Sequence, residues 1–199
     1  MKNIVITIGR QYGSGGRQVG KILAEKLGIP FYDKELLTEA AKKSGFCEEI
    51  FKENDEKPAG SFLYSLVMGA NGQDTLPLNN KLFLAQFDTI KEIASKGSCV
   101  IIGRCADYAL EEMASVLNVF IYADKKVRVK RAVEEYGLTA RNIEDAVNKI
   151  DKKRASYYNF YSGKKWGAAE SYNICIDSGK FGIEKTADFI KDCVEELTK

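Results

Sequence analysis

Histidine is absent from the 199 residues of this chain. This excludes a Ser-His-Asp or Cys-His nucleophile system, a histidine metal site and an imidazole general base. The five cysteines include no C-x-x-C pair and have no evident base partner, which disfavours a catalytic thiol. We expect them to be reduced and mostly in apolar surroundings, as in a cytoplasmic protein. They are Cys47, Cys99, Cys105, Cys175 and Cys193.

Long apolar runs are also lacking, and none approaches the ~18 residues of a membrane span. Residues 1–9 hold one lysine and a short apolar run that Arg10 and Gln11 follow at once, which favours a first strand over a signal peptide. The chain is 45% hydrophobic and 29% charged, which argues against disorder. We therefore expect one domain over residues 1–199 and no membrane partner.

Short apolar runs alternate along the chain with segments that have helical periodicity. The sequence predicts strands at 3–8, 29–32, 98–102, 116–122 and 172–176. It predicts helices at 16–27, 34–44, 81–96, 124–136, 139–161 and 182–198, two of them capped by Asp33 and Thr139. Residues 47–80 lack periodicity, and their glycines and prolines predict a mobile segment of loops and short helices. The pattern is typical of an α/β fold with a five-stranded parallel sheet and helices on both faces.

A glycine-rich loop joins the first strand to the first helix. Its glycines let backbone N–H groups converge on an anion at the helix N-terminus, where the helix dipole also favours negative charge. A tight turn alone would explain one or two glycines, so the loop predicts a phosphate site. The loop contains four glycines, a serine and two arginines: Gly9, Arg10, Gly13, Ser14, Gly15, Gly16 and Arg17.

Two kinds of phosphate site fit this loop: a mononucleotide P-loop and the dinucleotide loop of short-chain dehydrogenases. For the second, Asp33 lies where a ribose-binding acid would sit, and two Tyr-x-x-x-Lys matches have the catalytic spacing of that family. They are Tyr122 with Lys126 and Tyr161 with Lys165. The two tyrosines end a predicted strand and a predicted helix, whereas that catalytic pair should lie within one helix. This favours the P-loop.

Arginine is scarce, with seven residues against twenty-three lysines. Arginine makes bidentate phosphate contacts, and six of the seven arginines are expected where a parallel sheet would gather a polyphosphate. They are Arg10, Arg17, Arg104, Arg128, Arg131 and Arg154, the last expected to pair with Asp151. Residues 125–165 hold twelve basic and five acidic residues, an excess of +7 that suits phosphates of a nucleotide or a nucleic acid. Aromatics such as Tyr157 and Trp166 interleave there, but helical spacing favours core packing, so nucleic acid is a disfavoured partner.

The chain resembles the cytidylate kinase-like family, a branch of the nucleoside monophosphate kinases with P-loop folds. The resemblance covers nearly the whole chain. It is carried by six ordered segments: ITIGRQYGSGGRQVG, FYDKELL, VIIGRCADYAL, VFIYADKKVRVKRA, DKKRASYYNFYSGKKWG and YNICIDSG. It implies transfer of the γ-phosphoryl group of ATP to a nucleoside monophosphate, with CMP or dCMP as the expected acceptor. ATP with Mg²⁺ would be the co-substrate, and no permanently bound cofactor is expected.

The resemblance also implies a role for each candidate residue. The glycine loop with Arg10 and Arg17 would hold the ATP phosphates. An acceptor lobe near 33–97 and a lid and basic helix near 124–165 would complete the domain. The acceptor-binding residues would be Asp33, Arg104, Asp151 and Arg154, and the catalytic arginines would be Arg128, Arg131 and Arg17.

The loop departs from a Walker A sequence. Gly16 stands at the lysine position, and Arg17 and Gln18 follow where a hydroxyl is expected. Either Arg17 or Arg10 could supply the missing charge, although a planar guanidinium is not a point ammonium. No metal ligand is assigned. The departure leaves an alternative, a nucleotide-binding regulatory protein with little or no kinase activity. The sequence carries no signal for an oligomeric state.

Overall fold

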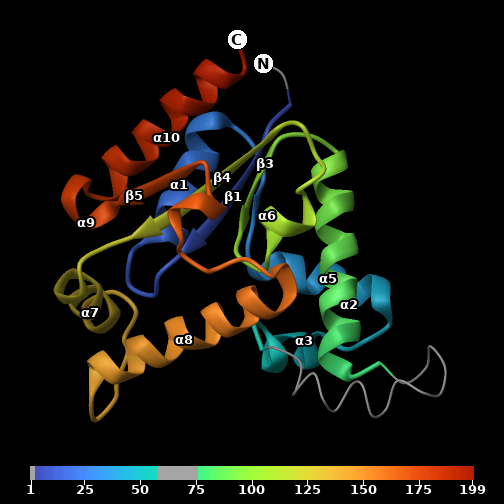
Figure 1. Cartoon of the computed structure of the whole chain (residues 1–199), viewed down its shortest axis with the longest axis horizontal. Coiled ribbons are helices and arrows are strands. Elements are labelled where there is room, and N and C mark those ends of the chain that lie inside the picture. The colour runs from blue at the N-terminus through green and yellow to red at the C-terminus, as the bar shows by residue number, and fades with distance from the viewer. Residues whose placement is uncertain (1–2, 58–75) are drawn as a thin grey trace.

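The computed structural model describes residues 3–57 and 76–199. Their strands form one parallel five-stranded sheet in the order β2-β3-β1-β4-β5 (Figure 1). The strands are β1 (Val5–Arg10), β2 (Phe31–Tyr32), β3 (Cys99–Ile102), β4 (Val116–Tyr122) and β5 (Ile174–Asp177). β1 pairs with β3 on one side and β4 on the other, so the chain reverses its direction of winding there. Ligands of such sheets bind beyond the carboxyl ends of the strands. The predicted α/β fold is confirmed.

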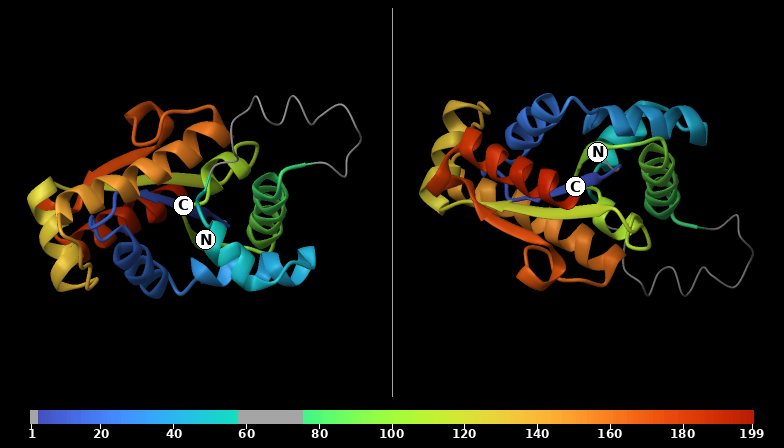
Figure 2. Two further views of the ribbon diagram at one scale, coloured as in Figure 1. Left: turned by 90° about the horizontal axis from the view of Figure 1, so that it is seen from below. Right: turned by 90° about the horizontal axis from the view of Figure 1, so that it is seen from above.

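Helices cover both faces of the sheet (Figure 2). The apolar side chains of α1 and α10 pack on one face, while α5, α6 and α8 lie over the other. The helices are α1 (Gly16–Leu27), α2 (Lys34–Ser44), α3 (Glu48–Asn54), α5 (Leu78–Ser95), α6 (Ala106–Ala109), α7 (Lys125–Glu134), α8 (Ile143–Ser162), α9 (Ser178–Phe181) and α10 (Ile183–Leu197), with a short 3₁₀ turn η2 (Ala169–Ser171).

The central strand β1 contributes to both cores because its side chains alternate between the two faces. Ile6 and Ile8 pack against α1 and α10, and Val5 packs against α5 and α6. The two isoleucines are fully buried, and each contributes about 1.5–3 kcal/mol by leaving water. This anchoring fixes the point at which the glycine loop begins.

Several predicted boundaries differ from the structure. α8 begins at Ile143 rather than 139, because the Asn142 side chain accepts the Asp145 N–H at 3.1 Å and caps the helix there. β5 begins at Ile174, two residues after the predicted start of this strand. α5 begins earlier, at Leu78 after Pro77, and the four-residue helix α6 was not predicted. Within the described residues, Asp33 makes no side-chain cap for α2, because its carboxylate binds arginines instead.

The aperiodic segment 47–80 contains α3 and the start of α5, as its short-helix pattern predicts. Residues 58–75 of that segment lie outside the described residues. All five cysteines are described and free, but Cys47 and Cys175 are exposed, contrary to the expected apolar surroundings. Among the helices of the described ranges, none is long and apolar enough to span a membrane.

Candidate functional site

The glycine loop between β1 and α1 turns at two left-handed glycines. Gly13 has φ +78° and Gly15 has φ +79°, a conformation that a side chain disfavours. A Cβ at Gly13 would lie 2.3 Å from the Arg128 carbonyl oxygen, and one at Gly15 would lie 2.2 Å from Ile183 Cδ1. Ser14 is fully buried, and its hydroxyl donates to the Gln11 carbonyl at 2.8 Å. The glycines therefore serve close packing against α7 and α10 as well as the turn.

At Gly16, the Walker lysine position, Arg10 occupies the space that a side chain would take. A Cβ at Gly16 would lie 2.5 Å from Arg10 Cβ, so the Arg10 stem lies where a lysine side chain would start. From there the Arg10 guanidinium donates through Nη1 to Glu56 Oε1 at 2.8 Å. Arg17, the other candidate for the missing charge, is 51% exposed and donates through Nε to Asp33 Oδ2 at 2.6 Å. Arg10 is the arginine that replaces the lysine stem in space.

Arg104 follows β3 and is held between two aspartates. Its Nη1 donates to Asp33 Oδ1 at 3.1 Å, and its Nε and Nη2 donate to the Asp55 carboxylate at 3.1 and 3.0 Å. Only 2% of the side chain is exposed. Burial raises the pKa of the Asp33 carboxyl, but Arg104 and Arg17 outweigh it and lower that pKa below its ordinary value. Arg104 itself has φ +56°, which is strained for a residue with a side chain.

A second acidic residue, Glu56, joins Arg10 to α8. Its Oε2 accepts from Arg154 Nε at 3.0 Å, and its other oxygen accepts from Arg10. Burial acts to raise the pKa of Glu56, yet Arg10, Arg154 and Arg104 hold it well below its usual range. Asp55 and Glu56 are not predictable from the sequence, because they lie in the aperiodic segment and their partners are distant in the chain.

α7 and α8 hold the glycine loop from the other side. Arg128 donates to the Asp151 carboxylate, and Asp151 Oδ1 accepts the Tyr12 N–H at 2.7 Å. Arg131 Nη1 donates to the Gly13 carbonyl at 2.9 Å. The predicted Asp151–Arg154 pair is wrong, because in the described residues Asp151 pairs with Arg128 and Arg154 with Glu56. Arg128 Nη1 also donates to the Tyr12 carbonyl at 3.3 Å, so both arginines of α7 contact the loop directly.

These groups surround a cavity of about 560 Å³ at the carboxyl ends of the strands. Asp33, Arg104 and Arg154 therefore line one cavity together with the glycine loop. Arg128, Arg131 and Asp151 contact the loop but do not line this cavity. Gly9 lies apart, beside Phe120 and Tyr172. Five basic and three acidic side chains line the cavity: Arg10, Arg17, Lys34, Arg104, Arg154, Asp33, Asp55 and Glu56.

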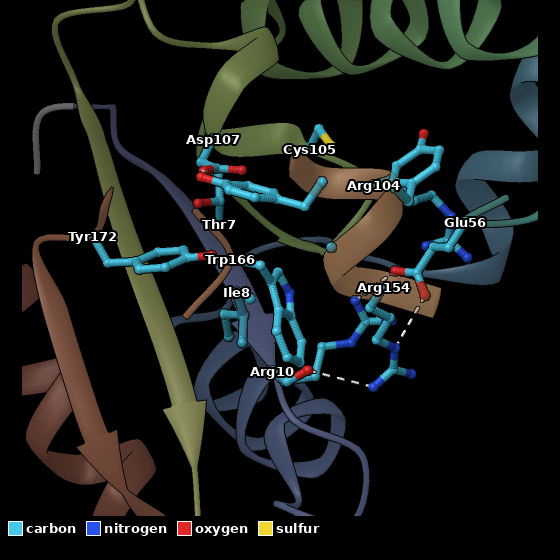
Figure 3. Close-up of a pocket in the computed structure, with 14 residues that line it drawn as sticks. Thr7, Ile8, Arg10, Glu56, Arg104, Cys105, Asp107, Arg154, Trp166 and Tyr172 are labelled. Carbon is cyan, nitrogen blue, oxygen red and sulfur yellow. Dashed lines mark hydrogen bonds and ion pairs between the residues drawn. The ribbon is translucent and has the colours of Figure 1, made fainter. Parts of the chain in front are cut away.

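A small chamber of about 20 Å³ adjoins this site behind Arg10 and Glu56 (Figure 3). Arg10, Arg154 and Glu56 meet on one side of it, and Asp107 and Tyr172 lie on the other. Burial raises the pKa of Asp107, whose carboxylate accepts the Tyr158 hydroxyl at 2.6 Å. Asp107 is thus committed to α8 and is separated from the larger cavity, which it does not line.

Metal ligands are not clustered in the described ranges, which contain no group of three or more His, Cys, Asp or Glu placed to hold an ion. The carboxylates nearest the loop are paired with arginines: Asp33, Asp55, Glu56 and Asp151. Burial raises the pKa of Cys99 to about 12 and that of Cys105 well above its usual value, so neither thiol is an activated nucleophile.

Most aromatic residues of α8 pack inward, although Phe160 is 41% exposed. Tyr157 and Tyr158 are each 5% exposed, and the Tyr161 ring stacks on Phe83 with centroids 3.9 Å apart. Trp166 packs edge-on against Phe120 at 5.2 Å. This packing leaves few platforms for nucleic-acid bases, as the helical spacing predicts.

Comparisons with known proteins agree with this architecture. The model of the cytidylate kinase-like family matches residues 5–180. A cytidylate kinase from Archaeoglobus fulgidus is 29% identical over 196 residues, covering 96% of this chain and 94% of that protein. One from Methanococcus vannielii is 24% identical over 199 residues, covering 96% and 100%.

Solved structures show the same fold. An uncharacterized protein from Eubacterium ventriosum has a TM-score of 0.71 and 32% identity, covering 96% of this chain and 98% of that one. Shikimate kinase from Acinetobacter baumannii, in complex with shikimate, has a TM-score of 0.56 and 17% identity, covering 99% and 95%. At that identity the second likeness shows the fold alone.

The positions of the two Tyr-x-x-x-Lys matches and the similarity to known proteins both argue against the dehydrogenase alternative. Tyr122 ends β4 while Lys126 lies in α7, and Lys165 lies beyond the end of α8, which contains Tyr161. Neither pair lies within one helix. The family match covers most of the chain, and the parallel sheet, glycine loop and gathered arginines are those of a P-loop kinase. The chain therefore belongs to the cytidylate kinase-like family and is an ATP-dependent phosphotransferase, a nucleotide kinase.

Proposed function

We propose that this enzyme transfers the γ-phosphoryl group of ATP to CMP or dCMP, giving ADP and the corresponding diphosphate. The observation that carries the proposal is the cavity at the carboxyl ends of the strands, where Arg10, Arg104 and Arg154 meet beside the glycine loop. The curated cytidylate kinases that share 21–29% identity with the chain support a cytidine nucleotide as the acceptor.

The two ends of the site suit two different phosphates. Backbone N–H groups of the loop and the N-terminus of α1 would hold the donor phosphates, with Arg10 supplying the charge of the missing lysine. Arg104, Asp33 and Arg154 would hold and orient the acceptor. Mg²⁺ would enter as part of the MgATP co-substrate and offset charge on its phosphates.

The reaction needs no histidine or other general base. An oxygen of the acceptor phosphate is already ionised at neutral pH, so it can bond to the γ-phosphorus as the bond to the β–γ bridging oxygen breaks. ADP leaves with those bonding electrons. Catalysis then rests on positioning and on charge stabilisation, for which Arg128 and Arg131 are placed against the loop.

One observation favours a second candidate, a nucleotide-binding regulatory protein. Gly16 replaces the Walker lysine, and each arginine of the cavity is paired with a carboxylate: Arg10, Arg17, Arg104 and Arg154. A regulatory protein would bind nucleotides with such a site and turn over slowly or not at all.

ADP formation from MgATP separates these candidates when it is measured with a panel of acceptors: CMP, dCMP, UMP, AMP, GMP and shikimate. We expect CMP and dCMP to give the highest kcat/KM, and ADP formation without acceptor to stay at background. Thermal stabilisation by nucleotides with no acceptor-dependent ADP would favour the regulatory protein. Faster turnover of another acceptor would refute the proposed specificity.

A further inference from the structure

Asp55 occupies the donors of Arg104 that a phosphate would need. Two parallel hydrogen bonds, at 3.1 and 3.0 Å, join the guanidinium to the Asp55 carboxylate, which is the fork geometry by which arginine binds phosphate. The remaining nitrogen, Nη1, donates to Asp33 Oδ1 and to the Ile102 carbonyl, both at 3.1 Å. A phosphate can therefore bind Arg104 in this way only if it replaces a carboxylate.

Glu56 does the same for the neighbouring arginines. Its two carboxylate oxygens accept from Arg10 and Arg154, which lie beside it in Figure 3. Both arginines also line the larger cavity. Glu56 has φ +52°, a left-handed backbone that a residue with a side chain rarely adopts. The strained turn is held by these ion pairs and by Lys153, whose Nζ donates to the Asp55 carbonyl at 2.7 Å.

The three carboxylates differ in how firmly they are anchored. The Asp33 side chain is 7% exposed, directly follows β2 and also pairs with Arg17. The Asp55 side chain is 28% exposed and directly follows α3, outside the sheet. Asp55 can leave into solvent with little disturbance of the core, and its strained neighbour Glu56 would move with it.

We infer that Asp55 and Glu56 are internal competitors of the acceptor phosphate, which occupy Arg104 and Arg154 in the free enzyme and leave when the acceptor binds. The inference rests on the proposed function, because it takes the group at Arg104 to be the acceptor phosphate. A phosphate monoester of charge about −2 and three oxygens is a stronger partner for an arginine fork than a carboxylate. The apparent affinity for the acceptor is then lowered by the fraction of enzyme in which the turn is closed.

The test compares Asp55→Asn with Glu53→Gln, an exposed acid on α3 that serves as the matched control. Weakening the competitor should lower the KM for CMP by about threefold to tenfold in Asp55→Asn, while the KM for ATP changes by less than twofold. Glu53→Gln should match the wild type in both constants. A KM for CMP that is unchanged or raised in Asp55→Asn would overturn the inference and make Asp55 a positioning residue.

A measurement on the wild-type enzyme decides the case if Asp55→Asn fails to fold. In a crystal structure with CMP bound, Arg104 should contact the CMP phosphate, and its two hydrogen bonds to Asp55 should be broken. A CMP complex in which Arg104 still binds Asp55 through both nitrogens would refute the inference. If the wild type phosphorylates CMP while either test fails, only this inference falls. If it phosphorylates no nucleoside monophosphate, the proposed function falls and the inference falls with it.

Discussion

Individual residues in this site are explained by what they contact rather than by residue type. Arg104 and Arg17 are both arginines near Asp33, yet the first is 2% exposed between carboxylates and the second is 51% exposed at the start of α1. Gly16 is a glycine because the Arg10 stem needs its space. The roles of these residues are separable by substitution.

Arg104→Lys tests the acceptor contact while keeping a cation between Asp33 and Asp55. A lysine cannot make the two parallel hydrogen bonds of a guanidinium, so the KM for CMP should rise at least tenfold, with the KM for ATP nearly unchanged. Steady-state kinetics measure both constants. Arg141→Lys, at an exposed position, is the control. Unaltered CMP kinetics in Arg104→Lys would remove Arg104 from the site.

Gly16→Lys restores the Walker lysine in sequence, but the structure predicts harm. The new Cβ would lie 2.5 Å from Arg10 Cβ, close to the backbone and unable to move far. We expect a loss of about 1–3 kcal/mol in the free energy of unfolding, measured by denaturant titration. The double variant with Arg10→Ala should regain much of it. Full stability together with tighter ATP binding in Gly16→Lys would contradict the assignment of Arg10 to the lysine's place.

At the scale of elements, α7 contacts the glycine loop, while α8 contacts the loop through Asp151 and lines the cavity through Arg154. α7 begins at Lys125, and the side chain of Asp124 just before it accepts the Lys126 N–H and caps the helix. Arg128 and Arg131 therefore lie one turn apart on the face toward the loop. Asp151 on α8 binds both Arg128 and the Tyr12 N–H. A change in the position of α7 or Asp151 should therefore shift the glycine loop.

Arg128→Lys tests this arrangement. The shorter, non-planar cation keeps the charge but loses the joint contact with Asp151 and the Tyr12 carbonyl. We propose that this contact serves the transition state, and therefore expect kcat to fall at least tenfold while both KM values stay within threefold. Lys130→Arg, on the exposed side of α7, should behave as wild type. A loss confined to KM would assign Arg128 to ground-state binding.

At the scale of the whole molecule, the ion pairs of the site make stability depend on pH. Arg10, Arg154 and Arg104 hold the pKa of Glu56 below its unfolded value of about 4.3. A lowered carboxyl pKa stabilises the fold above the unfolded pKa, and this contribution is lost as the pH falls toward the folded pKa.

Glu56→Gln should therefore destabilise the protein by about 3 kcal/mol at pH 7, because two largely buried arginines lose their partner. The difference from the wild type should shrink as the pH is lowered from 5 toward 3, because the unfolded chain then binds a proton at Glu56 while the paired carboxylate of the folded protein stays ionised. Urea titrations at several pH values measure it. A difference that stays constant down to pH 3 would show that Glu56 acts by packing and not by charge.

The sequence predicts the parts of this molecule that rest on local pattern. The alternation of apolar runs predicts the strands, and the glycine loop and the scarce arginines predict the site. Pairings between distant segments were not predictable: Arg104 meets Asp55 across 49 positions, and Arg154 meets Glu56 across 98. Helical spacing predicts a pair between Asp151 and Arg154. In the structure Asp151 pairs instead with Arg128 on α7, and Arg154 pairs with Glu56 after α3. Roles of the site residues, and the cytoplasmic location, stay predictions.

The most direct test of the central claim is to follow the phosphoryl group itself. Phosphorus NMR of one mixture of enzyme, MgATP and CMP records substrate and product resonances together. The account predicts that the γ-phosphoryl resonance of ATP declines while the β-phosphoryl resonance of CDP grows, with one CDP formed for each ADP. ADP accumulating without CDP, or ATP persisting unchanged beside enzyme that binds it, would contradict it.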